Sequence, residues 1–129
     1  MELKRLFTLA SLATALTGAT VAVAPMASAS GGIGDPTGGS SVSFESYGEK
    51  LSVFDTAPDG HSAVGDIERW DGQNWQFWDR VWNSNGHSNT PVTANYSFPE
   101  GQKVRYRACL GEAGTRSVFQ CSQWAPDTV

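Results

Sequence analysis

The sequence predicts an all-β protein, built as a small antiparallel β-sandwich of about seven strands. Apolar and polar residues alternate along several short segments, which is the pattern of strands with one buried face. Clusters of Pro, Asp, Asn and Gly separate these segments at regular spacing, as turns do. No segment carries a sustained helical period with capping residues.

Residues 1–29 are expected to be a secretory signal peptide that is cleaved after Ala29. Lys4 and Arg5 open the segment, an apolar stretch follows, and Ala27-Ser28-Ala29 forms a small-x-small cleavage site. A membrane anchor is the alternative interpretation, but polar residues interrupt the stretch and no cationic stop follows it. We therefore expect a secreted, extracellular protein that has no membrane association after cleavage.

Cleavage leaves a chain of 100 residues, enough for one domain. Loss of Glu2, Lys4 and Arg5 reduces the nine basic residues to seven and the thirteen acidic residues to twelve, so the net charge becomes −5. Nucleic acids and anionic membranes bind basic surfaces. The acidic balance therefore argues against both as partners.

Residues 30–41 are expected to form a flexible N-terminal arm, because five glycines and one proline fall within twelve residues. The arm is either a spacer left by export or a tail that orders against a partner. In the second case Ile33, its only large apolar residue, would insert into a groove. Asp35 and Pro36 follow it and join it as candidate partner-binding residues.

The sandwich is assigned to residues 42–129. Its first strand alternates Val42 and Phe44 with serines, and a turn at residues 47–50 leads into a second strand at 51–54. Pro58-Asp59-Gly60 is a strong turn signal, since Pro presets one turn dihedral and Gly accepts positive φ. Strands are then expected at residues 63–70, 75–82 and 92–98, separated by Asp-Gly and Asn-Gly turns.

The strand at residues 103–110 has the most regular alternation. Its even-numbered positions are apolar, whereas Lys103, Arg105, Arg107 and Cys109 share the opposite face. A short loop at residues 111–115 leads to the last expected strand, at 117–124.

Cys109 and Cys121 are expected to form a local disulfide, because an even pair in an oxidising compartment is most simply a bridge. Closing this short loop contributes about 3 kcal/mol in the chain-entropy account. Two thiols without a histidine pair make a poor zinc site. Cys109 faces away from the core side of its strand, so the pair joins neighbouring strands. The domain is therefore immunoglobulin-like or fibronectin-type-III-like in plan, without an antibody-type core disulfide.

The sequence carries no catalytic signature. His61 and His87 lie in polar turns, with no nucleophile elbow, zinc-binding helix or phosphate loop beside them. Six carboxylates lie between residues 55 and 79, but without the spacing of a calcium loop or a defined glycosidase pair. We expect a protein that is not an enzyme and needs no cofactor or metal.

Five aromatic residues between Trp70 and Trp82 form the strongest functional signal. On a regular strand, Trp75, Phe77 and Val81 would share one face, and Trp78, Arg80 and Trp82 would share the other. Because a sandwich buries one face of a strand, we expect Trp78, Arg80 and Trp82 to form an exposed binding surface. The alternatives are an aromatic core with a bulge that redirects one Trp, or a helix over residues 75–82.

The segments Tyr47–Leu51, Asp55–Ser62 and Val104–Cys109 resemble small secreted actinobacterial proteins. The whole plan of export signal, N-terminal arm and two-cysteine β domain resembles the small adaptor subunit of umbrella toxin particles. That resemblance implies two partners: a large toxin subunit whose stalk the arm engages, and a lectin-like subunit held by the sandwich.

The expected function is therefore a secreted, non-catalytic protein-binding adaptor or scaffold of an extracellular, toxin-type complex. A carbohydrate-binding module is one alternative, because exposed tryptophans stack on sugar rings. A secreted hydrolase inhibitor is another. In that case the loop Gly111–Thr115, held at its base by the disulfide, would enter an active site.

Overall fold

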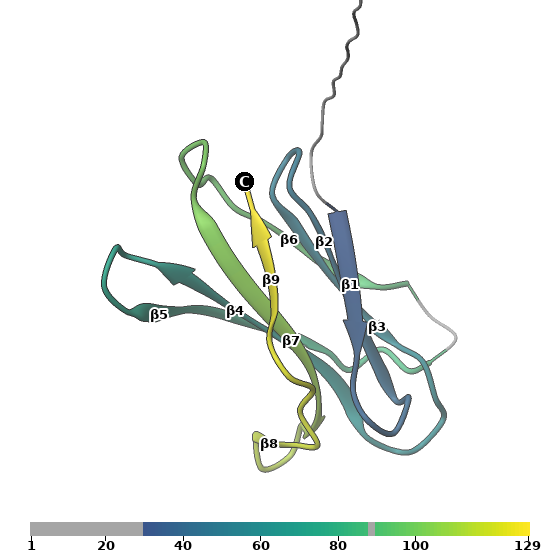
Figure 1. Ribbon diagram of the computed structural model, residues 1–129. Helices are drawn as coiled ribbons and strands as arrows, with labels where there is room; N and C mark the ends of the chain where they lie inside the picture. Colours follow the sequence, from purple (N-terminus) through teal and green to yellow (C-terminus); the bar gives the residue numbers. More distant parts are fainter. Residues whose placement is uncertain (1–29, 88–89) are drawn as a thin grey trace, which may run out of the picture.

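A computed structural model describes residues 30–87 and 90–129 as nine β-strands in two antiparallel sheets (Figure 1). The predicted all-β sandwich with one disulfide is thus confirmed, with nine strands in place of about seven. The predicted signal peptide, residues 1–29, lies outside the described residues. Over the described part of the chain, no helix has the length and apolar character to cross a membrane.

The four-stranded sheet has the order β1-β2-β3-β6. Its strands are β1 (Ser30–Gly34), β2 (Ser40–Glu45), β3 (Lys50–Asp55) and β6 (Val92–Asn95). Residues 96–98, which were expected to continue the last of these strands, lie outside it. Tyr96 and Phe98 nevertheless pack on each other, with ring centroids 5.5 Å apart.

The five-stranded sheet is centred on β4 (Ser62–Trp70) and β7 (Lys103–Glu112). The strand β5 (Trp75–Asn83) pairs with the outer edge of β4. Two short strands share the far edge of β7: β8 (Ser117–Phe119) pairs with its end, and β9 (Ala125–Thr128) with its start. The single strand predicted at 117–124 is therefore wrong beyond Phe119, where Gln120 adopts a φ of +52° that interrupts the extended chain.

The core lies between the two sheets and is built from the apolar faces that the alternation predicted. Phe44 of β2 stacks on Tyr106 of β7 with ring centroids 5.7 Å apart, which joins the sheets at their centre. Gly65 of β4 allows close approach here. A Cβ atom at that position would lie 2.7 Å from a methyl group of Val53, so any side chain would push the sheets apart.

The predicted flexible arm at residues 30–41 is wrong. Residues 30–34 form β1, an edge strand in continuous register with β2 from Ser30 opposite Glu45 to Gly34 opposite Ser41. Ile33 packs against the core, and Asp35 closes the turn that follows. Tertiary pairing thus overrides the low strand propensity of glycine, and glycine composition alone did not reveal it.

Candidate functional site: an aromatic–arginine face

The candidate site lies on the outer face of the five-stranded sheet. Alternation along β7 directs Arg105 and Arg107 away from the core, and the antiparallel register places them opposite Glu68 and Asp66 of β4. On the other side of β4, Arg80 of β5 lies opposite the same Asp66. Asp66 is therefore flanked by arginines from both neighbouring strands, whereas Glu68 has an arginine on the β7 side alone.

Asp66 is the centre of this arrangement. Its side chain is fully buried, yet it binds two arginines. Arg80 donates from Nε to Oδ1 at 2.7 Å and from Nη2 to Oδ2 at 3.0 Å, and Arg107 donates from Nε to Oδ2 at 2.9 Å. The hydrogen bond to Asp66 raises the pKa of the Arg80 guanidinium above its ordinary value. The two-bond fork fixes the Arg80 guanidinium in place, and a single bond to the same buried carboxylate holds that of Arg107.

A second ion pair leads into a stack of rings and guanidinium groups. Arg105 binds Glu68 at 2.7 Å, and its Cζ atom lies 4.6 Å from the ring centroid of Trp75. The same atom lies 4.7 Å from the Trp124 ring, while Arg107 lies over that ring at 4.6 Å. Trp75, Arg105, Trp124 and Arg107 therefore form a continuous row across the sheet, held by cation–π contacts.

Two more aromatic residues extend this surface along β5. Phe77 is 56% exposed and lies 5.8 Å from the Arg80 guanidinium. Trp82 lies beneath Arg116, whose Cζ atom is 4.0 Å from its ring centroid. A Cβ atom on Gly111 would lie 2.6 Å from the Trp82 ring, so glycine at this position lets the ring pack closely against β7.

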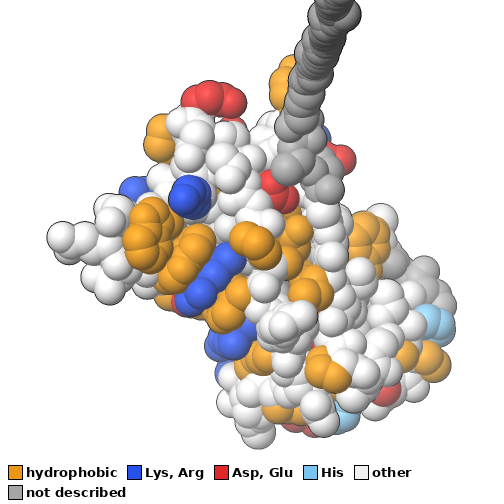
Figure 2. Space-filling view, in the orientation of Figure 1, with side chains coloured by type: hydrophobic (Ala, Val, Ile, Leu, Met, Phe, Trp, Pro, Cys, Tyr) orange, Lys and Arg blue, Asp and Glu red, His pale blue; other side chains and the backbone are white. Residues whose placement is uncertain are grey.

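We call this surface the aromatic–arginine face. Figure 2 shows apolar and basic side chains interleaved over the five-stranded sheet. The face comprises the outward-facing aromatic and arginine side chains of β5, β7 and the residues that follow them: Trp75, Phe77, Arg80, Trp82, Arg105, Arg107, Arg116 and Trp124.

A β-bulge alters the composition expected for this surface. The register of β4 and β5 shifts between Ile67 and Glu68, so that Asp79 faces Ile67 and Phe77 faces Glu68, and Trp78 has no partner position. The predicted grouping of Trp78 with Arg80 and Trp82 is therefore wrong for Trp78. The bulge that was the alternative interpretation is present, and it brings Trp75 and Phe77 to the side of Arg80 and Trp82.

Trp78 itself turns to the end of the core. Its ring lies 5.4 Å from that of Phe98, and the Arg69 guanidinium lies 5.3 Å from its centroid. It remains 46% exposed. The strand over residues 75–82 excludes the helix that was considered as an alternative.

The disulfide helps to position Trp124. Cys109 is buried on the outer side of β7, and its bond to Cys121 holds the chain that follows β8 against that strand, with Cα atoms 4.1 Å apart. Ser122 then bonds Ala108 twice: its backbone N–H donates to the Ala108 carbonyl at 2.8 Å, and its hydroxyl oxygen accepts from the Ala108 N–H at 3.0 Å. Trp124 follows directly, between Arg105 and Arg107. The predicted disulfide is confirmed.

The N-terminal candidates do not join this face. Asp35 is buried and accepts hydrogen bonds from Thr37 and Ser40 across its own turn. Burial alone would raise its pKa, but these bonds outweigh it and lower the pKa below the usual value. The Asp35 carboxylate is therefore hydrogen-bonded within its own turn. Ile33 and exposed Pro36 line a groove of about 410 Å³ with residues 121–123.

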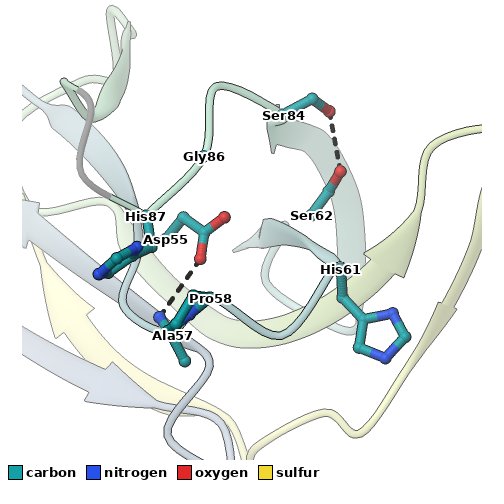
Figure 3. Close-up of a pocket in the computed structure, with 9 residues that line it drawn as sticks. Asp55, Ala57, Pro58, His61, Ser62, Ser84, Gly86 and His87 are labelled. Carbon is teal, nitrogen blue, oxygen red and sulfur yellow. Dashed lines mark hydrogen bonds between the residues drawn. The ribbon is translucent and has the colours of Figure 1, made fainter.

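A separate pocket of about 430 Å³ lies where the loops around the two histidines meet (Figure 3). Ser62 shares a hydrogen bond of 2.9 Å with Ser84, so the two serine hydroxyls are bonded to each other. His61 points away from His87, lies 3.2 Å from Glu112 and packs edge-on against Phe119. Among the described residues around this pocket, Ser62 therefore bonds Ser84 and His61 bonds Glu112, which differs from the histidine–serine pair that activates a nucleophile.

The described residues also contain no candidate metal site: among residues 30–87 and 90–129, no group of three or more His, Cys, Asp or Glu side chains is placed to hold an ion.

Sequence reasoning identified Arg80 and Trp82 but missed the other half of the face. The signal for Arg105 and Arg107 was present in the alternation of their strand. The signal for Asp66 and Glu68 lay in the opposing alternation of β4. The sequence alone did not reveal the register between the strands, which places the arginines opposite the carboxylates. Trp124 depends on the disulfide and on the break at Gln120.

Comparison with known proteins adds no assignment, since no protein-family model, curated protein or solved structure matches the chain significantly.

Proposed function

We propose that the protein is a non-catalytic binding module that uses the aromatic–arginine face to bind another protein. The observation that carries this proposal is the row of Trp75, Arg105, Trp124 and Arg107. Trp and Arg are the residue types most enriched at energetic centres of protein interfaces. Here they are already ordered by ion pairs to Asp66 and Glu68. Side chains fixed in advance lose less entropy on binding.

The specific form of the proposal is an adaptor or scaffold subunit of a secreted, toxin-type complex. Its support is the resemblance of the chain to the adaptor of umbrella toxin particles. The disulfide supports an oxidising, extracellular location, since such bonds persist there. The partners proposed on this basis are a large toxin subunit and a lectin-like subunit.

The carbohydrate-binding alternative is less favoured by the same contacts. Sugar stacking needs an open ring face, whereas guanidinium groups lie within 4.0–4.7 Å of the Trp75, Trp82 and Trp124 ring centroids. A sugar approaching from that side would have to displace an arginine. Phe77 and Trp78 are more exposed than these three rings, but the bulge places the two on opposite faces of β5.

The hydrolase-inhibitor alternative depends on the loop Gly111–Thr115. Gly111 and Glu112 belong to β7, and residues 113–116 form the exposed tip. This alternative predicts that the tip is needed for binding and the aromatic–arginine face is not.

Affinity capture with residues 30–129 as bait, from the extracellular fluid of the source organism, tests the proposal. Phe77→Ser removes an exposed ring from the face and should reduce recovery of a partner at least about tenfold, as loss of an interface hot spot does. Tyr47→Ser is the matched control, because Tyr47 is an 87% exposed ring in the turn between β2 and β3. Equal recovery with both variants would overturn the proposal.

A further inference from the structure

The charge of this protein is unevenly distributed. Residues 30–129 contain seven Lys and Arg residues and twelve Asp and Glu residues, so the net charge is −5. Five of the seven cations lie on or beside the outer face of the five-stranded sheet: Arg80, Lys103, Arg105, Arg107 and Arg116. The acidic side chains among them are Asp66 and Glu68. The face therefore carries +3, and the rest of the domain carries −8.

The internal ion pairs leave this positive charge available. Asp66 supplies one negative charge to two guanidinium groups, those of Arg80 and Arg107. Glu68 neutralises Arg105. Exposed Lys103 and Arg116 contribute two more positive charges at opposite ends of β7. The excess charge is therefore spread along the row of rings.

The arginines are held where a bound anion would interact strongly. The side chains of Arg80, Arg105 and Arg107 are only 27–34% exposed. An aromatic ring lies close to each of their guanidinium groups. Ion pairs between fully exposed groups contribute little, whereas charge-assisted bonds in a partly dehydrated site are stronger. Arginine also presents a planar fork that matches a carboxylate.

A long polyanion is a poor match for this surface. The rest of the domain carries a net charge of −8, opposite in sign to the face. A heparin-like chain or a nucleic acid that extended past the sheet would therefore be repelled by this negative charge. The exposed ring of Phe77 also needs an apolar counterpart. A folded protein surface offers both, with a few carboxylates set among apolar side chains.

We propose that the partner of the aromatic–arginine face is a protein whose contact surface is acidic, with Asp or Glu side chains that bind the guanidinium row and apolar side chains that cover Phe77. This inference rests on the proposed function and states the chemistry of the partner. It also predicts association that is steered by charge and weakened by salt.

The first test uses a short peptide that alternates Glu with Leu as the probe, with heparin and the same peptide carrying Lys in place of Glu at equal charge concentration, and follows tryptophan fluorescence of residues 30–129. The Glu–Leu peptide should bind, and its affinity should fall at least about tenfold between 50 and 300 mM salt because the attraction is screened. The double variant Lys103→Glu with Arg116→Glu should weaken binding by a similar factor. These positions leave the buried Asp66 pairs intact.

Lys50→Glu is the matched control, because it changes the charge by the same amount per site on the four-stranded sheet. It should leave the affinity within about twofold, since Lys50 lies on the other sheet and salt screens charges at a distance. Tighter binding of heparin than of the Glu–Leu peptide would overturn the inference and indicate a sulfated glycan. Absence of binding to the Glu–Leu peptide, or equal binding by the double variant, would overturn it too.

The second test separates this inference from the proposed function. In one outcome, capture of a partner requires Phe77 but is unchanged or strengthened by Lys103→Glu with Arg116→Glu. That outcome would support the aromatic–arginine face as the binding surface and overturn the inference that the partner is acidic. Capture that is lost in both Phe77→Ser and the charge-reversed variant, and retained in Tyr47→Ser and Lys50→Glu, supports both.

Discussion

Asp66 is fully buried on the outer side of the five-stranded sheet, and Arg80 covers it with two hydrogen bonds of 2.7 and 3.0 Å. A charged carboxylate in this position is unusual, because the outer face of a two-layer sandwich is ordinarily solvated. Its burial results from the arginines and rings above it. The ion pair therefore contributes to the aromatic–arginine face and to the stability of the fold at once.

Replacing Asp66 should destabilise the domain strongly. In Asp66→Asn the two arginines lose the carboxylate that orders them, and we expect about 2–4 kcal/mol lower free energy of unfolding, as when one partner of a buried pair is removed. Glu68→Gln is the control, since Glu68 is 16% exposed and binds only Arg105. Its effect should be smaller. Urea denaturation measures both, and an equal loss would contradict the central role of Asp66.

The fold was predictable because it follows from alternation that acts within each strand. Val42 and Phe44, or Val104 and Tyr106, are apolar at every second position, and they lie in the core as expected. The disulfide was predictable from the spacing and orientation of Cys109 and Cys121. These features depend on residues close together in the sequence.

The aromatic–arginine face was predictable only in part, because it depends on strand register and on one irregularity. A single extra residue in β5 moves Trp78 to the core end and brings Phe77 beside Arg80. Side chains alternate with a period of two, so a shift of one residue exchanges the faces. Nothing in the composition of residues 75–82 marks the position of that bulge.

Removal of the disulfide should disrupt the face as well as the stability. Cys109→Ser with Cys121→Ser should lower the free energy of unfolding by about 3 kcal/mol, the loop-closure contribution of a short loop. Trp124 should also lose its fixed place between Arg105 and Arg107. Near-ultraviolet circular dichroism of the folded variant should then show weaker tryptophan signals. An unchanged spectrum would contradict the role of the disulfide in holding this ring.

Stability should decline in alkaline solution because of Tyr106. Burial, together with the nearby charge of Asp127, raises the pKa of this phenol from 10.0 to about 12. Its neutral form is thus favoured by the fold. The resulting stabilisation is fully present below pH 10, where the unfolded chain is also protonated, and is lost as the pH rises through 12.

Thermal melting between pH 9 and 12 checks this expectation. Tyr106→Phe keeps the ring that stacks on Phe44 and removes the phenol. This variant should show a smaller decline across the same range, with the remainder due in part to Tyr96, whose pKa burial also raises. Identical curves for the parent and Tyr106→Phe would exclude Tyr106 as the group responsible.

The last prediction concerns β1, because its role as a strand changes what truncation should do. A flexible arm at residues 30–41 could be deleted without effect on folding, whereas β1 pairs along its length with β2 and brings Ile33 against the core. Ile33 is half-buried, so Ile33→Asp should cost about 1–2 kcal/mol, less than the full value of burying one aliphatic side chain. For a domain of this size, that lowers the melting temperature by about 4–16 °C. Deletion of residues 30–41 should cost more, since Phe44 and Tyr106 would lose their cover at this edge.

Pro36→Ala, at an exposed turn position, is the control and should change stability by less than about 1 kcal/mol. Unchanged melting of the deletion variant would mean that β1 contributes nothing to the sheet, and that any partner lost with it was bound by these residues directly.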